Sequence, residues 1–323
     1  MTAPSISPAP VAALEPGDRL DLVTEPSLRS LAAAARRDPR AGFAAVVALT
    51  AESVAAVVDV DRTPTVGFAL SPPVPGVPTR YALDGPPGPG DPVVLTRPGA
   101  DGTPEWSLHT AAEVAVRPAV LPRGMALWGV VVAEVEVAPD AVPAPRPGPR
   151  ATAAGPAALD PGLAAVLALG AHALGLAARF RDAFLRKAAT SARGWAAVKT
   201  IDDPLVVRSL GDADALLDGA AALLGARAGA ALGHPGRVGA AEGAQLAAAA
   251  CAAVDAARRA TTGLMTLSGA SALYDASPMQ ESYALLAALA AHPLLDRSAR
   301  RRATRTALDP DVDRLLAGQG GPR

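Results

Sequence analysis

The sequence contains few of the residues that define several classes of protein. Among its 323 residues there is a single cysteine, Cys251, and there are four histidines. One cysteine cannot form a disulfide within the chain and cannot build a multi-cysteine metal site. The histidines lie far apart and lack the short spacings typical of metal ligands. We therefore expect no disulfide framework and no metal, and we expect Cys251 to be a buried structural thiol.

An excess of charge of either sign is also missing, because 30 Lys and Arg residues face 31 Asp and Glu residues. This balance argues against nucleic acid or an anionic membrane as a partner. The arginine-rich run 297–305 is a local exception, which we interpret as a helix end that complements the helix dipole. Residues 1–20 do not resemble a signal peptide. The apolar stretch 163–180 contains Gly and His and does not indicate a membrane span. We expect a soluble, cytoplasmic protein.

Aromatic residues make up 3% of the chain, although 50% of it is hydrophobic. The apolar content is mostly Ala, Val and Leu, which suits closely packed helices. The length is sufficient for two domains. The sequence has no P-loop, no G-x-G-x-x-G after a strand, no H-E-x-x-H and no G-x-S-x-G. It therefore carries no motif for the nucleotide-binding, metalloprotease or hydrolase classes that these patterns mark.

The amino-terminal part divides by composition. Residues 1–20 are rich in Pro and Ala, so we predict disorder there. Residues 21–62 form the next unit, with two short helices predicted at 28–37 and 43–58. This unit is the candidate for an amino-terminal helical segment.

The amino-acid composition changes in the middle of the chain. Prolines, glycines and Val-rich stretches appear over residues 63–138, including the run 92–95. Apolar and acidic residues alternate over 133–137, which is the period of a half-buried strand. We predict a small β domain over 63–138, followed by a Pro/Ala linker at 139–156.

The remaining chain has the signals of a helical bundle, predicted over 157–307 with a tail at 308–323. Three helix starts place an N-cap residue before proline, at Asp160-Pro161, Asp203-Pro204 and Ser277-Pro278. Gln280 lies three residues after Ser277, which predicts a capping box. Two apolar faces recur at helical spacing. They comprise Leu169, Ala173, Leu176, Phe180 and Phe184, and Val206, Leu210, Ala213, Leu217, Ala220 and Leu224. Such seams suit four antiparallel helices.

The segment 268–280, with its small-residue turn, Tyr274 and a Ser-Pro-Met-Gln helix start, resembles the acyl-CoA dehydrogenase superfamily. It looks most like the branch of flavin monooxygenases built on that fold. Residues 203–213 resemble the start of the second bundle helix, and 80–85 resemble the strands that open the middle domain. The resemblance implies an α+β, mainly α fold. Its parts would be a shortened N-terminal helical part, a small middle β domain and a C-terminal four-helix bundle.

Several positions depart from the family pattern. Where the family contacts the flavin ring with a Ser/Thr-Gly segment, this chain has the proline-rich run 85–92, which supplies few amide donors. The family's second contact turn corresponds to 123–129, which has no hydroxyl. The family's Arg-Asp pair falls on Ala284 and Leu285. The histidine near the active site of the monooxygenase branch falls on His292.

The resemblance makes His292 the candidate catalytic residue, as an acid/base or hydrogen-bond donor. The alternative is a histidine at the carboxyl end of a helix, where the dipole favours its charge. Tyr274 and Asp275 are candidates for lining a substrate or flavin, and the alternative for both is a turn or core role. Gln280 either completes the cap or contacts the ligand.

Three functions remain open at this stage. The chain is an acyl-CoA dehydrogenase-like flavoprotein acting on an acyl thioester or related small molecule, with an FAD site that looks incomplete in the isolated chain. Alternatively, it is a flavin-independent lyase, isomerase or cyclase on the same fold. In the third hypothesis it is a non-catalytic subunit that pairs with a full-length homologue. Members of the family form oligomers through this bundle, and their flavin contacts two subunits, so a homo- or hetero-oligomer is expected.

Overall fold

A computed structural model describes most of the chain. It covers residues 26–56, 64–70, 79–83, 86–98, 104–117, 131–135, 159–192, 199–232, 238–274 and 277–318. The predicted disorder at 1–20 and the predicted linker at 139–156 lie outside these residues, as does the expected flavin-contact turn at 123–129.

Two helices precede the first strand of the described chain: α1 at Pro26–Arg37 and α2 at Pro39–Ala55. The prediction placed the start of α2 at residue 43, which was too late. Asp38 is its N-cap, with the carboxylate accepting a hydrogen bond from the Arg40 amide at 2.9 Å. Pro39 then occupies the first helical turn, where its missing N–H costs nothing. The cap leaves a single residue between the two helices and turns the chain sharply.

The predicted β region forms one six-stranded sheet in the order β4-β3-β1-β2-β6-β5. The strands are β1 Thr65–Ala69, β2 Thr79–Leu83, β3 Pro92–Pro98, β4 Pro104–Thr110, β5 Ala115–Arg117 and β6 Val131–Val135. Only β1 and β3 pair in parallel, and all other neighbours are antiparallel. The strand predicted from the alternation near residue 133 is β6, and the Val-rich run at 92–95 lies in β3.

The described residues of the helical half form three long α-helices and two shorter ones. They are α4 Pro161–Thr190, α5 Pro204–Leu232, α6 Ala240–Leu267, α7 Pro278–Ala290 and α8 Arg297–Gly318. All three predicted starts are confirmed. The capping carboxylates or hydroxyl accept hydrogen bonds from the amides of Gly162, Leu205 and Met279. Every residue of the two predicted apolar seams is buried.

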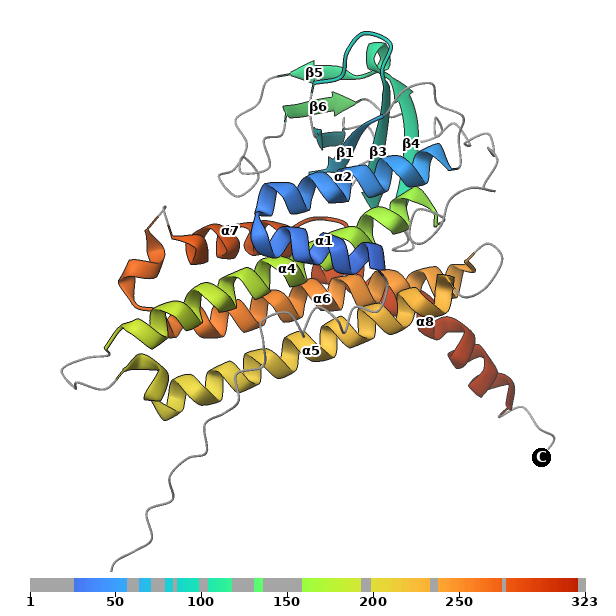
Figure 1. Cartoon of the computed structure of the whole chain (residues 1–323). Coiled ribbons are helices and arrows are strands. Elements are labelled where there is room, and N and C mark those ends of the chain that lie inside the picture. The colour runs from blue at the N-terminus through green and yellow to red at the C-terminus, as the bar shows by residue number, and fades with distance from the viewer. Residues whose placement is uncertain are drawn as a thin grey trace, which may run out of the picture.

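Helix α4 lies at the centre of the molecule. It contacts α1 and α2 on one side, α6 and α7 on another, and strands β3 and β4 at its beginning. Figure 1 shows the resulting layers, with the sheet above α2, the central helices below it, and α5 on the far side. At the start of α4, the Trp106 indole N–H donates to the Asp160 carboxylate at 3.0 Å. Sheet and bundle are therefore joined directly at this point.

Two glycines allow the front helices to approach α4 closely. A Cβ atom on Gly175 of α4 would overlap the carbonyl oxygen of Ala32 in α1. A Cβ on Gly42 of α2 would lie 2.5 Å from the Ala35 side chain and 2.7 Å from Nδ1 of His172. Such distances are below van der Waals contact, so a side chain at either position would push the helices apart.

Helices α4 and α5 are long and apolar enough to cross a membrane by length and composition. The apolar window of α4 is 89% buried within the protein, as expected of a core helix, and that of α5 is 39% buried. Helix α5 packs its seam against α6 and leaves its other face exposed.

The interpretation of the arginine-rich run was wrong. Helix α8 begins at Arg297 and continues to Gly318, so the run lies at the amino end of the helix. Positive side chains there oppose the helix dipole instead of complementing it.

Candidate functional site at the junction of sheet and bundle

Four rings form a buried cluster where the sheet meets the helices. Phe43 of α2 and Phe68 of β1 lie next to each other, with ring centroids 6.0 Å apart. His172 of α4 packs edge-on against Phe43, and His292, after α7, packs edge-on against Phe68, each at 6.3 Å. None of the four residues is more than 4% exposed. The cluster joins α2, α4, the sheet and the turn between α7 and α8.

His172 has no hydrogen-bond partner for either ring nitrogen among the described residues. The Phe43 ring packs edge-on against it, and Gly42 approaches Nδ1 so closely that a Cβ atom there would lie 2.7 Å away. Complete burial lowers the pKa of this imidazole to about 3. A buried charge without a partner is costly, so His172 is neutral at pH 7.

His292 has one ring nitrogen in use. Its Nδ1 accepts a hydrogen bond from the Leu294 amide at 3.3 Å, whereas its buried Nε2 has no partner in the described part of the chain. Burial lowers its pKa to about 4. Helix α7 ends before it, with Ala291 as the C-cap. His292 thus lies at the carboxyl end of α7, as the alternative placed it, but burial disfavours the charge that the helix dipole would favour.

The predicted capping box at the start of α7 is only half formed. The Ser277 hydroxyl accepts from the Met279 amide at 3.3 Å, so the cap exists. Gln280 does not return the bond, because its Oε1 is buried and lacks a partner among the described atoms. A buried amide oxygen in this state has an unused acceptor. Ligand contact by Gln280 stays a prediction.

The other predicted lining residues are not part of the ring cluster. Tyr274 follows the short helix η6, Ala270–Leu273, and its side chain is 71% exposed. Asp275 lies outside the described residues. Nearby, Glu281 forms an ion pair with Arg179 of α4 at 2.9 Å, which holds α7 against the central helix. The described chain contains no group of three or more potential metal ligands, so it supplies no candidate metal site.

Solved structures share this fold at low sequence identity. The 3-HSA hydroxylase from Rhodococcus sp. RHA1 has a TM-score of 0.66 at 19% identity, over 88% of this chain and 82% of the hydroxylase. Butyryl-CoA dehydrogenase from Megasphaera elsdenii gives 0.62 at 14% identity, over 87% and 81% of the two chains. Nitroalkane oxidase from Podospora anserina gives 0.61 at 17% identity, over 90% and 80%. The comparison with curated proteins gives no match.

The helical half carries the sequence-level match. Residues 167–308 match the family model described as acyl-CoA dehydrogenase, C-terminal domain. The helical half is therefore similar to this domain of the acyl-CoA dehydrogenases, and the solved structures show the same fold over most of the chain. The resemblance noted at 268–280 lies within the matched region, and the predicted fold class is confirmed by the fold of the solved structures.

Of the ring cluster, only His292 was predicted from the sequence; the other three members were not. His172 lies within an Ala- and Leu-rich helix, where a lone histidine has no motif around it. Phe43 and Phe68 look like ordinary core residues of a helix and a strand. The chain has only four phenylalanines, and two of them pack beside histidines. That packing identifies the cluster, but it can be seen only in the folded structure.

Proposed function

We propose that this chain is an acyl-CoA dehydrogenase-like subunit that acts on an acyl thioester or a related small molecule together with a full-length homologue. In this proposal its own flavin site is incomplete, and the homologue carries the FAD. The ring cluster is the observation that supports it most, because Phe43, Phe68, His172 and His292 fill the junction where the resemblance expects flavin and substrate. The expected setting is a soluble, cytoplasmic complex.

The described residues fit a flavin ring poorly. Phe68 lies directly against His292, with ring centroids 6.3 Å apart, which leaves no layer for another ring between them. The run 86–91, which takes the place of the family's ring-contact segment, contains three prolines without N–H groups. Of its amides, that of Gly88 donates to the Asp91 carboxylate at 2.8 Å and that of Asp91 donates to the Gly88 carbonyl at 3.0 Å. These donors are therefore occupied within the loop.

A partner surface is available at one end of the bundle. Leu205 and Val207 at the start of α5 are 52% and 49% exposed, and Leu273 and Tyr274 beside η6 are 61% and 71% exposed. The start of α5 and the end of α6 lie at the same end of the molecule (Figure 1). Exposed apolar side chains in a group favour contact with another protein. Tyr274 would then line a site formed by two chains rather than one.

Purified protein tests the proposal directly. We expect a colourless protein that does not take up FAD, and a stable complex when it is co-expressed with a full-length homologue from the same source. Leu205→Asp combined with Tyr274→Ala should dissociate the complex. Leu308→Asp is the matched control, because Leu308 is 51% exposed but lies on α8. Visible flavin bands in the isolated chain, or tight FAD uptake, would contradict the proposal.

One observation favours a second candidate, the flavin-independent lyase, isomerase or cyclase. Nε2 of His292 is buried, unpaired among the described atoms and neutral at pH 7, so it could accept a proton from a substrate that displaced Phe68. Turnover of an acyl thioester by the isolated, colourless chain would support this function. Activity should then be lost in His292→Asn, which keeps an acceptor for the Leu294 amide but has no Nε2. Activity unchanged in that variant would remove His292 from the mechanism.

A further inference from the structure

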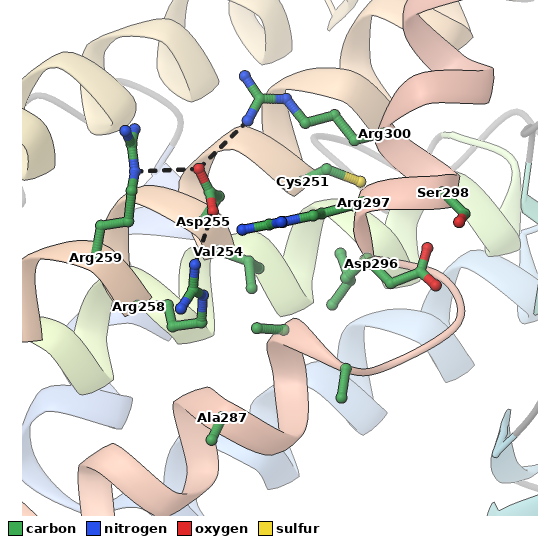
Figure 2. Close-up of a pocket in the computed structure, with 13 residues that line it drawn as sticks. Cys251, Val254, Asp255, Arg258, Arg259, Ala287, Asp296, Arg297, Ser298 and Arg300 are labelled. Atoms are coloured by element: carbon green, nitrogen blue, oxygen red, sulfur yellow. Dashed lines mark hydrogen bonds and ion pairs between the residues drawn. The ribbon is translucent and has the colours of Figure 1, made fainter. Parts of the chain in front are cut away.

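A cleft lies away from the ring cluster, between α6, the end of α7 and the start of α8. Its volume is about 750 Å³, which is within the range of small-molecule sites. Four arginines line it, two from each of α6 and α8: Arg258, Arg259, Arg297 and Arg300. Figure 2 shows all four around this cleft, with Cys251 and Ala287 on its apolar wall. No sequence motif pointed to this site, because its residues come from separate helices.

Positive charge in the cleft is only partly balanced. Asp255 alone is shared by three guanidinium groups, at 3.5 Å from Arg258, 3.1 Å from Arg259 and 3.4 Å from Arg300. Asp296 is the only other acid of the lining, and its carboxylate accepts from the Ala299 amide at 2.7 Å. Four arginines against two aspartates leave an excess of two positive charges in the cleft.

Arg297 adds to this imbalance. It extends into the cleft, and no ion pair joins it to any acid among the described residues (Figure 2). Arg297 and Arg300 also occupy the first turn of α8, where the helix dipole adds further positive potential. Like charges held together at a helix amino end destabilise the protein unless an anion joins them. The arrangement is therefore suited to a multiply charged anion.

The wall of the cleft is apolar and provides a surface for an organic group. It is formed by Val254, Ala287, Ala290, Ala291 and Leu295. We propose that this cleft binds a small molecule that carries a diphosphate on an organic body, of the nucleoside diphosphate type. Guanidinium groups match phosphate oxygens in bidentate geometry, and the excess of two positive charges suits a diphosphate.

Calorimetric titration of the full chain with ADP, sodium pyrophosphate and adenosine tests the proposal. ADP should bind and raise the melting temperature, pyrophosphate should bind more weakly, and adenosine should not bind. Binding of ADP should weaken as NaCl is raised, because charged contacts are screened. If neither ADP nor pyrophosphate binds at millimolar concentration, the proposal is overturned. Equal affinity for ADP and pyrophosphate would overturn the role of the apolar wall.

Arginine variants locate the site. Arg297→Gln and Arg300→Gln should each weaken ADP binding by about tenfold or more, the usual effect of losing a hydrogen bond to a charged group. Arg301→Gln is the matched control, since Arg301 is exposed on the same helix turn but does not line the cleft. It should change affinity by less than about twofold, as screened surface charges do. Arg297→Lys should retain part of the affinity. Equal losses in all three Gln variants would show a general charge effect and no site.

Discussion

The two buried histidines should make the stability of this fold depend steeply on pH between 7 and 5. In the folded chain the pKa is about 3 for His172 and about 4 for His292, whereas the ordinary value is 6.5. Because the folded pKa values are lowered, the unfolded chain binds more protons than the folded chain below about pH 6.5. The stabilisation is therefore complete above that pH and is lost as the pH falls toward 4.

The magnitude follows from the unfolded chain alone. At pH 5 an imidazole with an ordinary pKa gains about 2 kcal/mol from protonation, and an imidazole buried without a partner gains almost nothing. Two such residues lower the free energy of unfolding by roughly 4 kcal/mol between pH 7 and pH 5. That is a large fraction of the stability of a typical protein. The result is insensitive to the folded pKa values as long as both stay below about 4.5.

The assay is urea unfolding, followed by circular dichroism, at pH 7 and pH 5. The test protein is the double variant His172→Leu, His292→Asn, in which neither position titrates and an acceptor remains for the Leu294 amide. It should lose about 4 kcal/mol less than the wild type between the two pH values. Phe184→Leu is the control for a core change without titration, and its pH dependence should equal that of the wild type. If wild type and double variant lose the same stability, the histidines are solvated or paired and the reasoning fails.

Four further predictions concern packing, caps, charges and the thiol. Gly175→Ala should destabilise the fold by about 1–3 kcal/mol in the same urea assay, because the added Cβ would overlap the Ala32 carbonyl oxygen. Gly219 lies on α5 with open space around it, so Gly219→Ala should stabilise the fold by about 0.5–1 kcal/mol. Ser277→Ala should lower the free energy of unfolding by about 1 kcal/mol, because it removes the N-cap. Gln280→Leu should leave it unchanged, since the Gln280 oxygen makes no bond within the described chain. An equal loss in both variants would show that Gln280 completes a capping box after all. Asp214→Ala should cost about 3 kcal/mol, because it removes both hydrogen bonds of the largely buried Arg181 and leaves only its 3.9 Å ion pair with Asp182. Asp212→Ala, whose partner Arg208 is 82% exposed, should change thermal stability by less than about 0.5 kcal/mol. Cys251, whose pKa burial raises to about 12, should react with iodoacetamide at pH 8 only after unfolding, and rapid labelling of the native protein would show that its thiol is accessible in the fold.

Local signals in the sequence were sufficient for the helical half. A capping residue before proline acts on the next few amides of the same chain, so the starts of α4, α5 and α7 could be recognised without the fold. The seam of α5 repeats at helical spacing, and every member is buried. The family resemblance at 268–280 depends on consecutive residues and needed no tertiary contact either.

Only the tertiary structure decided the surroundings of individual side chains. His172 and His292 are 120 positions apart, and their shared cluster exists because α2 and β1 bring Phe43 and Phe68 between them. Burial there sets the pKa of both rings, and burial depends on which elements pack together rather than on neighbours in sequence. The arginine-rich run 297–305 is a second example. Composition located its charges, but only the structure showed that α8 begins at Arg297, so that the helix dipole opposes these charges instead of favouring them. Composition and spacing thus determined the helices of this protein, and packing determined which of their residues are neutral, paired or left with uncompensated charge.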